Sequence, residues 1–268
     1  MHLKPFLHKI IMAKLPKKFQ FIDLSDYGRP AGQWIAKRFQ YTSVTPIHVT
    51  TMFFITGFIA IGFMLNEYYI TAAFFIILKS ILDAADGELS RLKNTPSYVG
   101  RYYDSIADIL LNFCFLSAFC YLSEASVIQM LLAFICIQLQ GTVFNYYYVI
   151  LRHSVEGDST SRIIEDCAPT AFKGESQNMV NIFYKIYNIL YISFDKVMYY
   201  MDRNARYSPP FPKWFMTLVS IYGLGFQLLI MAFMLVFKLH EFVIPFFIIY
   251  SVFIFVIVGL RILFLKPQ

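Results

Sequence analysis

The sequence predicts an all-α integral membrane protein with six transmembrane helices and an N-terminal amphipathic interfacial helix. Of its 268 residues, 58% are hydrophobic and only 15% are charged, whereas a water-soluble domain has about a quarter of its residues charged. Six apolar stretches also have about the length that an α-helix needs to cross a bilayer. They cover approximately residues 49–65, 69–84, 106–122, 127–151, 214–237 and 242–265.

The N-terminal arm, residues 1–45, combines basic residues with apolar residues at helical spacing. A basic amphipathic helix lying on an anionic leaflet fits this pattern. A frayed polar tail is the alternative, because Pro5, Pro16 and Pro30 interrupt the pattern and proline is disfavoured inside a helix. The apolar positions are Leu3, Phe6, Leu7, Ile10, Ile11, Trp34, Ile35 and Phe39.

The basic residues are unevenly distributed among the loops. They gather in the arm, between the second and third apolar stretches, in the connection 152–213 and near the C-terminal end. The turns after the first and third stretches contain no Lys or Arg. Because basic loops stay on the cytoplasmic side, we expect both termini and the second turn to be cytoplasmic.

The connection 152–213 is too polar to cross a membrane. Its second part, 178–203, repeats apolar residues at helical spacing but also contains Lys185, Asp195 and Asp202. An interfacial helix and a helix packed against the protein's own bundle are both compatible with this pattern. We therefore expect a membrane domain over 46–268 with a cytoplasmic or interfacial insertion at about 152–213.

Four aspartates occupy the facing ends of the second and third apolar stretches. Residues three or four positions apart share a helix face, and the short connection contains Pro96, so the two helices should be antiparallel neighbours. Their facing stripes would then bring four carboxylates together at the cytoplasmic border. The stripes consist of Asp83, Asp86, Gly87 and Ser90, with Arg91 adjoining, and of Gly100, Asp104 and Asp108.

Four carboxylates at low dielectric repel one another and lose hydration. A divalent cation resolves this conflict, and oxygen ligands favour Mg2+ or Mn2+, held as one ion or as two about 4 Å apart. Gly87 and Gly100 lack side chains and would let a diphosphate approach, and Arg91 could clamp its oxygens. The alternative is a simple hairpin whose acids pair with Lys79, Arg91, Lys93 and Arg101, but the joint spacing of the signature residues disfavours it.

These residues resemble the signature of the CDP-alcohol phosphotransferases, D-x2-D-G-x2-A-R-x8-G-x3-D-x3-D. Every spacing matches, and the one departure is Ser90 in the place of Ala. The segment TPIHVT, residues 45–50, is similar to the family's T-P-N-x-x-T opening; Ile47 stands in the Asn position, and Thr50 is retained.

The resemblance implies a membrane enzyme of phospholipid synthesis that transfers a phosphate-bearing group from a CDP-linked alcohol, here favoured to be CDP-diacylglycerol, to an acceptor alcohol and releases CMP. It implies a homodimer with two Mg2+ or Mn2+ ions and no nucleic-acid partner. Asp108 would be the general base. Asp83, Asp86, Asp104 and also Asp108 would bind metal, and Gly87, Ser90, Arg91, Gly100 and Thr50 would bind the CDP moiety.

The sequence leaves several assignments open. A divalent-cation transporter is the second hypothesis, since intramembrane acids also bind transported ions, and a catalytically inactive scaffold is the third. Lys79 either balances the acids or snorkels, and Arg261 faces either an acceptor phosphate or lipid headgroups. The run 146–148 near Asn145 is either part of an acceptor site or, as favoured here, an aromatic belt. The acceptor alcohol is not assigned.

Overall fold

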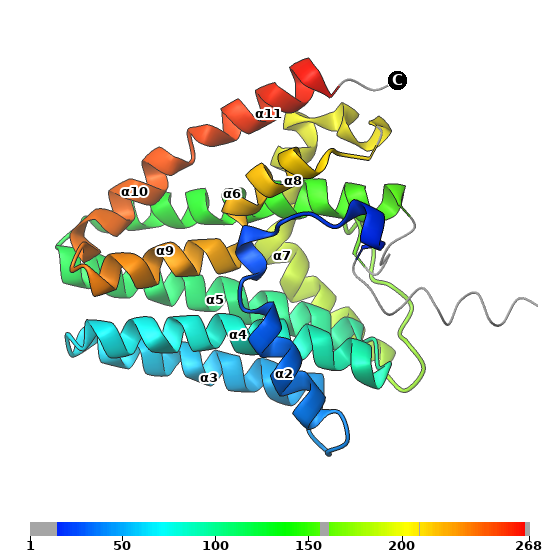
Figure 1. Cartoon of the computed structure of the whole chain (residues 1–268), viewed down its shortest axis with the longest axis horizontal. Coiled ribbons are helices and arrows are strands. Elements are labelled where there is room, and N and C mark those ends of the chain that lie inside the picture. The colour runs from blue at the N-terminus through cyan, green and yellow to red at the C-terminus, as the bar shows by residue number, and fades with distance from the viewer. Residues whose placement is uncertain (1–14, 156–160, 209, 266–268) are drawn as a thin grey trace, which may run out of the picture.

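A computed structural model describes residues 15–155, 161–208 and 210–265 (Figure 1). All regular elements in these ranges are helical, which confirms the all-α prediction. The apolar positions of the arm between 3 and 11 lie outside the described residues. The α-helices are α2 (Arg29–Phe39), α3 (Pro46–Leu65), α4 (Tyr69–Lys93), α5 (Tyr98–Ser123), α6 (Val127–Ser154), α7 (Gln177–Met201), α8 (Lys213–Val219), α9 (Leu224–Val236), α10 (Val243–Tyr250) and α11 (Phe253–Phe264).

Helices α3, α4, α5, α6 and α9 run roughly alongside one another and form the body of the bundle (Figure 1). Helices α10 and α11 follow α9 in the chain; α10 packs against α6, and α11 rises obliquely away from the bundle. Short 3-10 segments join these helices: η1 (Lys17–Phe19), η2 (Leu24–Asp26), η3 (Arg203–Tyr207), η4 (Ser220–Tyr222) and η5 (His240–Phe242).

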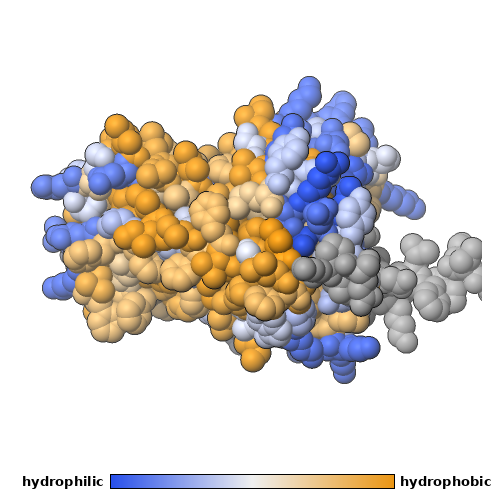
Figure 2. Space-filling view, turned by 90° about the horizontal axis from the view of Figure 1, so that it is seen from above, coloured by the Kyte–Doolittle hydropathy of each residue, from blue (hydrophilic) through white to orange (hydrophobic). Residues whose placement is uncertain are grey.

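Within the described residues, four helices are long and apolar enough to cross a membrane: Pro46–Leu65, Tyr98–Ser123, Val127–Ser154 and His240–Phe264. A fifth candidate is the pair Lys213–Tyr222 and Leu224–Val236, which is bent by 52°. Figure 2 shows a broad hydrophobic surface over the middle of the molecule with hydrophilic residues at its ends, as in a multi-pass membrane protein.

Helix α4 has the length of a span, but it is too charged to qualify by composition, because Lys79, Asp83 and Asp86 lie within it. The number of six spans therefore stays a prediction. The stretch predicted at 214–237 is broken at Gly223, which has an extended backbone. A Cβ at Gly223 would lie 2.3 Å from the Ser25 side chain, so this break accommodates the N-terminal arm.

The α4–α5 hairpin is defined by local signals at its turn. Helix α4 ends at Lys93, and the next residue, Asn94, adopts the left-handed conformation that terminates helices. Pro96 follows, and the Ser97 hydroxyl caps α5 by accepting a hydrogen bond from Gly100 N at 2.7 Å. The first signature stripe therefore ends, and the second begins, within one helical turn of the connection.

Helix α2 packs across the end of α4 that carries the aspartates. Gly32 makes this approach possible, because a Cβ there would lie 3.0 Å from the backbone nitrogen of Ala85. On the other side of α2, the Trp34 side chain is exposed and the Arg38 guanidinium lies 5.0 Å from its ring centroid. That α2 lies at the membrane surface remains a prediction.

Helix α7 forms much of the second half of the insertion and packs against α5 and α6. Val180, Asp195 and Met198 are the buried residues of α7. The opposite face exposes Ile182, Ile189 and other apolar residues. An interfacial helix and a helix packed against the bundle were the two alternatives for 178–203. They are compatible, because α7 contacts the bundle on one face and exposes an apolar face that could lie on a membrane surface.

Candidate functional site

Three of the four aspartates converge at one point between α4 and α5. One carboxylate oxygen from each of Asp83, Asp104 and Asp108 lies within 4.8 Å of the others. Asp104 Oδ1 is buried and has no hydrogen-bond partner among the described residues. A buried carboxylate oxygen without a partner is costly, so this donor set fits a hard divalent cation.

Asp86 lies beside this group and is 8% exposed. Its Oδ2 accepts a hydrogen bond of 2.7 Å from the Thr50 hydroxyl of α3. Thr50 itself is 2% exposed and contacts the acid rather than the cavity described below. A hydroxyl that orients a carboxylate in this way resembles the outer-shell groups that hold metal ligands.

Lys79 lies on α4 one turn before Asp83, and its side chain is 1% exposed. Its Nζ donates to Asp83 Oδ2 at 2.9 Å and to Asp108 Oδ1 at 2.5 Å. It also lies 4.4 Å from the ring centroid of Phe53. Of the two roles that the sequence left open, Lys79 therefore balances the acids and does not snorkel.

Gly87 and Arg91, which are predicted to bind the diphosphate, lie on the same face of α4 and border the cavity. A Cβ at Gly87 would meet only the Arg91 guanidinium, at 3.6 Å, and both residues line the cavity. Arg91 is oriented by Glu88, whose Oε1 lies 2.9 Å from Arg91 Nη2 and 2.8 Å from Arg29 Nε.

Like Thr50, the predicted CDP-binding residues Ser90 and Gly100 do not line the cavity. The Ser90 hydroxyl donates to the carbonyl of Thr95 at 3.1 Å. Gly100 packs against its own helix cap, since a Cβ there would lie 3.1 Å from Ser97 Oγ. The structure thus gives both residues contacts within the hairpin turn.

The aspartates open into a cavity of about 470 Å³. Its walls come from η2, α4, α5, α6, α7 and α9 and from the loop before α7. Away from the acids the lining is rich in carboxamides, and Gln138 Nε2 is buried without a partner among the described residues. These carboxamides belong to Asn112, Gln138, Asn145 and Gln227.

The insertion supplies one wall of this cavity, which sequence reasoning did not predict in detail. Glu165 is 3% exposed, accepts from the Tyr102 hydroxyl at 3.3 Å and pairs with Arg101 Nη2 at 2.7 Å. The Tyr191 hydroxyl donates to the carbonyl of Ser105 at 2.7 Å. The acids and tyrosines within the insertion were the only sequence signal for this wall. Their partners on α5 lie far away in the sequence and could not be predicted.

Asp195 also lines the cavity and is 8% exposed. Burial raises the pKa of its carboxyl to about 7; Glu165 adds to the rise, and Arg101 opposes it. The cavity therefore contains an acid of the insertion in addition to the four signature aspartates.

Arg261 and the tyrosine run have structural partners. Arg261 Nη2 lies 2.5 Å from Asp202 Oδ1, and both side chains are 2% exposed. The Tyr147 hydroxyl donates to Asp202 Oδ2 at 2.8 Å, and the Tyr146 hydroxyl donates to the Asp202 carbonyl at 2.7 Å. The aromatic-belt interpretation is wrong for these two tyrosines, because they are buried inside the protein.

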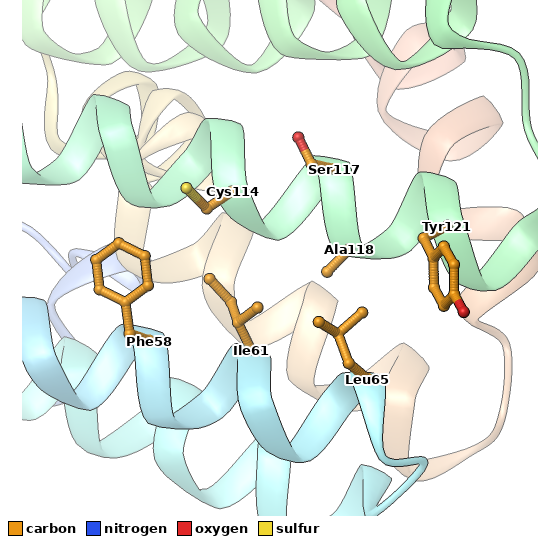
Figure 3. A pocket seen from close by; sticks show the side chains of 7 residues that line it. All are labelled: Phe58, Ile61, Leu65, Cys114, Ser117, Ala118 and Tyr121. Atoms are coloured by element: carbon orange, nitrogen blue, oxygen red, sulfur yellow. The ribbon is translucent and has the colours of Figure 1, made fainter.

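A second pocket, of about 490 Å³, lies between α3 and α5 at the end away from the aspartates (Figure 3). Its lining is apolar apart from the polar atoms of Cys114, Ser117 and Tyr121. It contains no acid or base that could assist phosphoryl transfer. The lining residues are Phe58, Ile61, Leu65, Cys114, Ser117, Ala118 and Tyr121.

Chemically, the first cavity brings together oxygen ligands for a cation, an arginine for phosphate oxygens and a carboxylate that can accept a proton. Residues 44–174 match the family model described as CDP-alcohol phosphatidyltransferase, which confirms the resemblance seen in the signature. The matched segment contains α3 to α6 and all four aspartates. No curated protein sequence matches the chain.

Proposed function

We propose that this chain transfers a phosphatidyl group from CDP-diacylglycerol to an acceptor alcohol with release of CMP. The match of residues 44–174 to the model of the CDP-alcohol phosphatidyltransferases, a family of phosphotransferase enzymes, supports this proposal. The observation that carries this proposal is the convergence of Asp83, Asp104 and Asp108 within 4.8 Å at a cavity that Arg91 also lines. Phosphoryl transfer depends mainly on positioning and charge neutralisation, and this arrangement supports both.

In the proposed site, Asp83, Asp86, Asp104 and Asp108 hold Mg2+ or Mn2+. The bound ion would neutralise charge on the diphosphate and stabilise CMP as the leaving group. Gly87 and Arg91 receive the diphosphate. In this proposal the nucleotide binds near the C-terminal end of α4, at the cytoplasmic border of the membrane, where a lipid-linked substrate can enter sideways.

Asp108 acts as the general base in this proposal. Lys79 engages its Oδ1, so the other carboxylate oxygen accepts the proton of the acceptor hydroxyl as that hydroxyl attacks phosphorus. A positioned base of this kind contributes about 100- to 10,000-fold to the rate.

The membrane arrangement follows the distribution of charge. We place both termini and the active site on the cytoplasmic side, in a multi-pass homodimer that serves phospholipid synthesis. The arm 1–45 lies on the membrane surface, the membrane domain covers 46–268, and the insertion at about 152–213 closes one wall of the site.

The test is turnover by the purified full chain in detergent with Mg2+, CDP-diacylglycerol or CDP-choline, and a panel of acceptor alcohols, measured as CMP release. We expect turnover with CDP-diacylglycerol and a loss of about 100- to 10,000-fold for Asp108→Asn. Glu124→Gln, at the far end of α5, is the matched control and should retain activity. The absence of turnover with every pair, together with a cation flux in liposomes that Asp108→Asn changes, would refute the enzyme and favour a transporter.

A further inference from the structure

We propose that the ammonium group of Lys79 is a built-in cation of the metal centre, so that the site takes a single divalent ion beside it and not two. The inference rests on the proposed function of the same site and concerns how this chain balances the charge of its four aspartates.

Lys79 lies between two of the candidate metal ligands. Its Nζ bridges the helices, from Asp83 Oδ2 of α4 at 2.9 Å to Asp108 Oδ1 of α5 at 2.5 Å. Both carboxylates belong to the group whose oxygens could hold a metal ion. The ammonium thus already makes the charge-assisted contacts that a second cation would make with these oxygens.

The environment of Lys79 keeps it in this place. The side chain is 1% exposed, and Nζ lies 4.4 Å from the Phe53 ring centroid, within cation–π range. Moving the ammonium away from the acids would leave a charge in an apolar core without a partner, which is strongly unfavourable. A second metal ion would therefore have to displace a buried and paired cation.

The remaining acids define where one ion can bind. Asp104 Oδ1 is buried without a partner among the described residues, and Asp86 is oriented by Thr50. Among the described residues, Lys79 forms its ion pairs with Asp83 and Asp108 and not with these two acids. The ligand oxygen that still lacks a partner among the described residues is therefore Asp104 Oδ1, and the hydrogen bonds of Lys79 go to Asp83 and Asp108 instead.

The net charge of the site also favours one divalent ion beside Lys79. The four ionised carboxylates carry four negative charges, and Lys79 cancels one. One divalent ion would leave a single negative charge at the site, whereas two divalent ions would leave a net positive charge before any substrate binds. If Lys79 is removed, two divalent ions are needed to neutralise the four acids.

The inference is tested by titrating the metal-stripped full chain in detergent with Mn2+ and counting bound ions by electron paramagnetic resonance of free Mn2+. Lys79→Met and Lys79→Gln remove the ammonium; the glutamine variant keeps a hydrogen-bond donor in case the methionine variant does not fold. Lys93→Met is the matched control, because Lys93 also lies on α4 but its Nζ binds the carbonyls of Thr42 and Val44.

We expect one Mn2+ per chain for the parent and for Lys93→Met, and two for either Lys79 variant. Two ions in the parent, or one ion in a folded Lys79 variant, would overturn the inference. A parent that binds two ions and still releases CMP would overturn it while the proposed function stands. A parent that binds no Mn2+ and has no turnover would refute both.

Discussion

Asp195 and Asp202 are two buried acids of the insertion for which the structure predicts opposite effects of the same substitution. Asp202 pairs with Arg261 at 2.5 Å, with both side chains 2% exposed, and accepts a hydrogen bond from the Tyr147 hydroxyl. In Asp202→Asn the amide oxygen can still accept from Tyr147. The substitution therefore removes mainly the charge that compensates buried Arg261.

Removing one member of a buried ion pair costs about 3–5 kcal/mol, because the other charge is left without compensation. For a protein of this size, each kcal/mol lowers the melting temperature by about 2–4 °C. Asp202→Asn should accordingly melt on the order of 10 °C below the parent. Thermal unfolding of the purified chain in detergent, followed by tryptophan fluorescence, measures this loss.

Asp195→Asn is the matched comparison, since burial raises the pKa of Asp195 to about 7. A carboxyl whose pKa is raised in the folded state loses stability as the pH rises from about 4, the unfolded value, to about 7. Above pH 7 the ionised acid lowers the free energy of unfolding by up to about 4 kcal/mol. The asparagine variant lacks this penalty. Its melting temperature should therefore be higher than that of the parent at about pH 8 and equal to that of the parent at about pH 4.

The reasoning about buried charge would be refuted by two results. One is an Asp202→Asn protein that melts within about 2 °C of the parent, which corresponds to less than about 1 kcal/mol. The other is an Asp195→Asn protein whose melting temperature, relative to the parent, does not rise with pH.

Two further predictions concern residues around the site. A Cβ at Gly225 would lie 1.9 Å from the backbone oxygen of Ser25, so Gly225→Ala should displace the arm and cost about 1–3 kcal/mol by overpacking. Gly62→Ala, with no atom within 4 Å of its new Cβ, should be neutral or stabilising in the same thermal assay; equal destabilisation by both would contradict the packing argument. Thr50→Val removes the 2.7 Å hydrogen bond to Asp86 and should weaken Mn2+ binding by about 10- to 100-fold. Unchanged Mn2+ affinity would show that this hydroxyl does not support the metal centre.

The sequence predicted correctly those features that depend on a single helix or a single turn. The spacing of Asp83 and Asp86, and of Asp104 and Asp108, placed each pair on a single helix face, because helix geometry relates residues three and four apart. Pro96 and the short connection predicted the hairpin for the same local reason. The six apolar stretches were harder to interpret, since charged α4 and the bend at Gly223 blur the hydropathy signal.

The contacts of Lys79, Arg261 and Tyr147 could not be derived from the sequence. Lys79 reaches Asp108 across 29 positions, and Arg261 reaches Asp202 from the last helix of the structure. Whether a lysine in an apolar helix snorkels or pairs depends on which neighbouring helix supplies an acid at the right height. That neighbour is known only once the bundle is packed.

By itself, the sequence determined an all-helical, membrane-type chain and the local pattern of a phosphotransferase signature, because hydrophobicity and helical periodicity are properties of single segments. Only the tertiary structure decided that Lys79 lies among the aspartates, that the insertion closes the cavity with Glu165 and Asp195, and that Arg261 is a structural residue. These features depend on contacts between distant segments, which form only when the helices pack together.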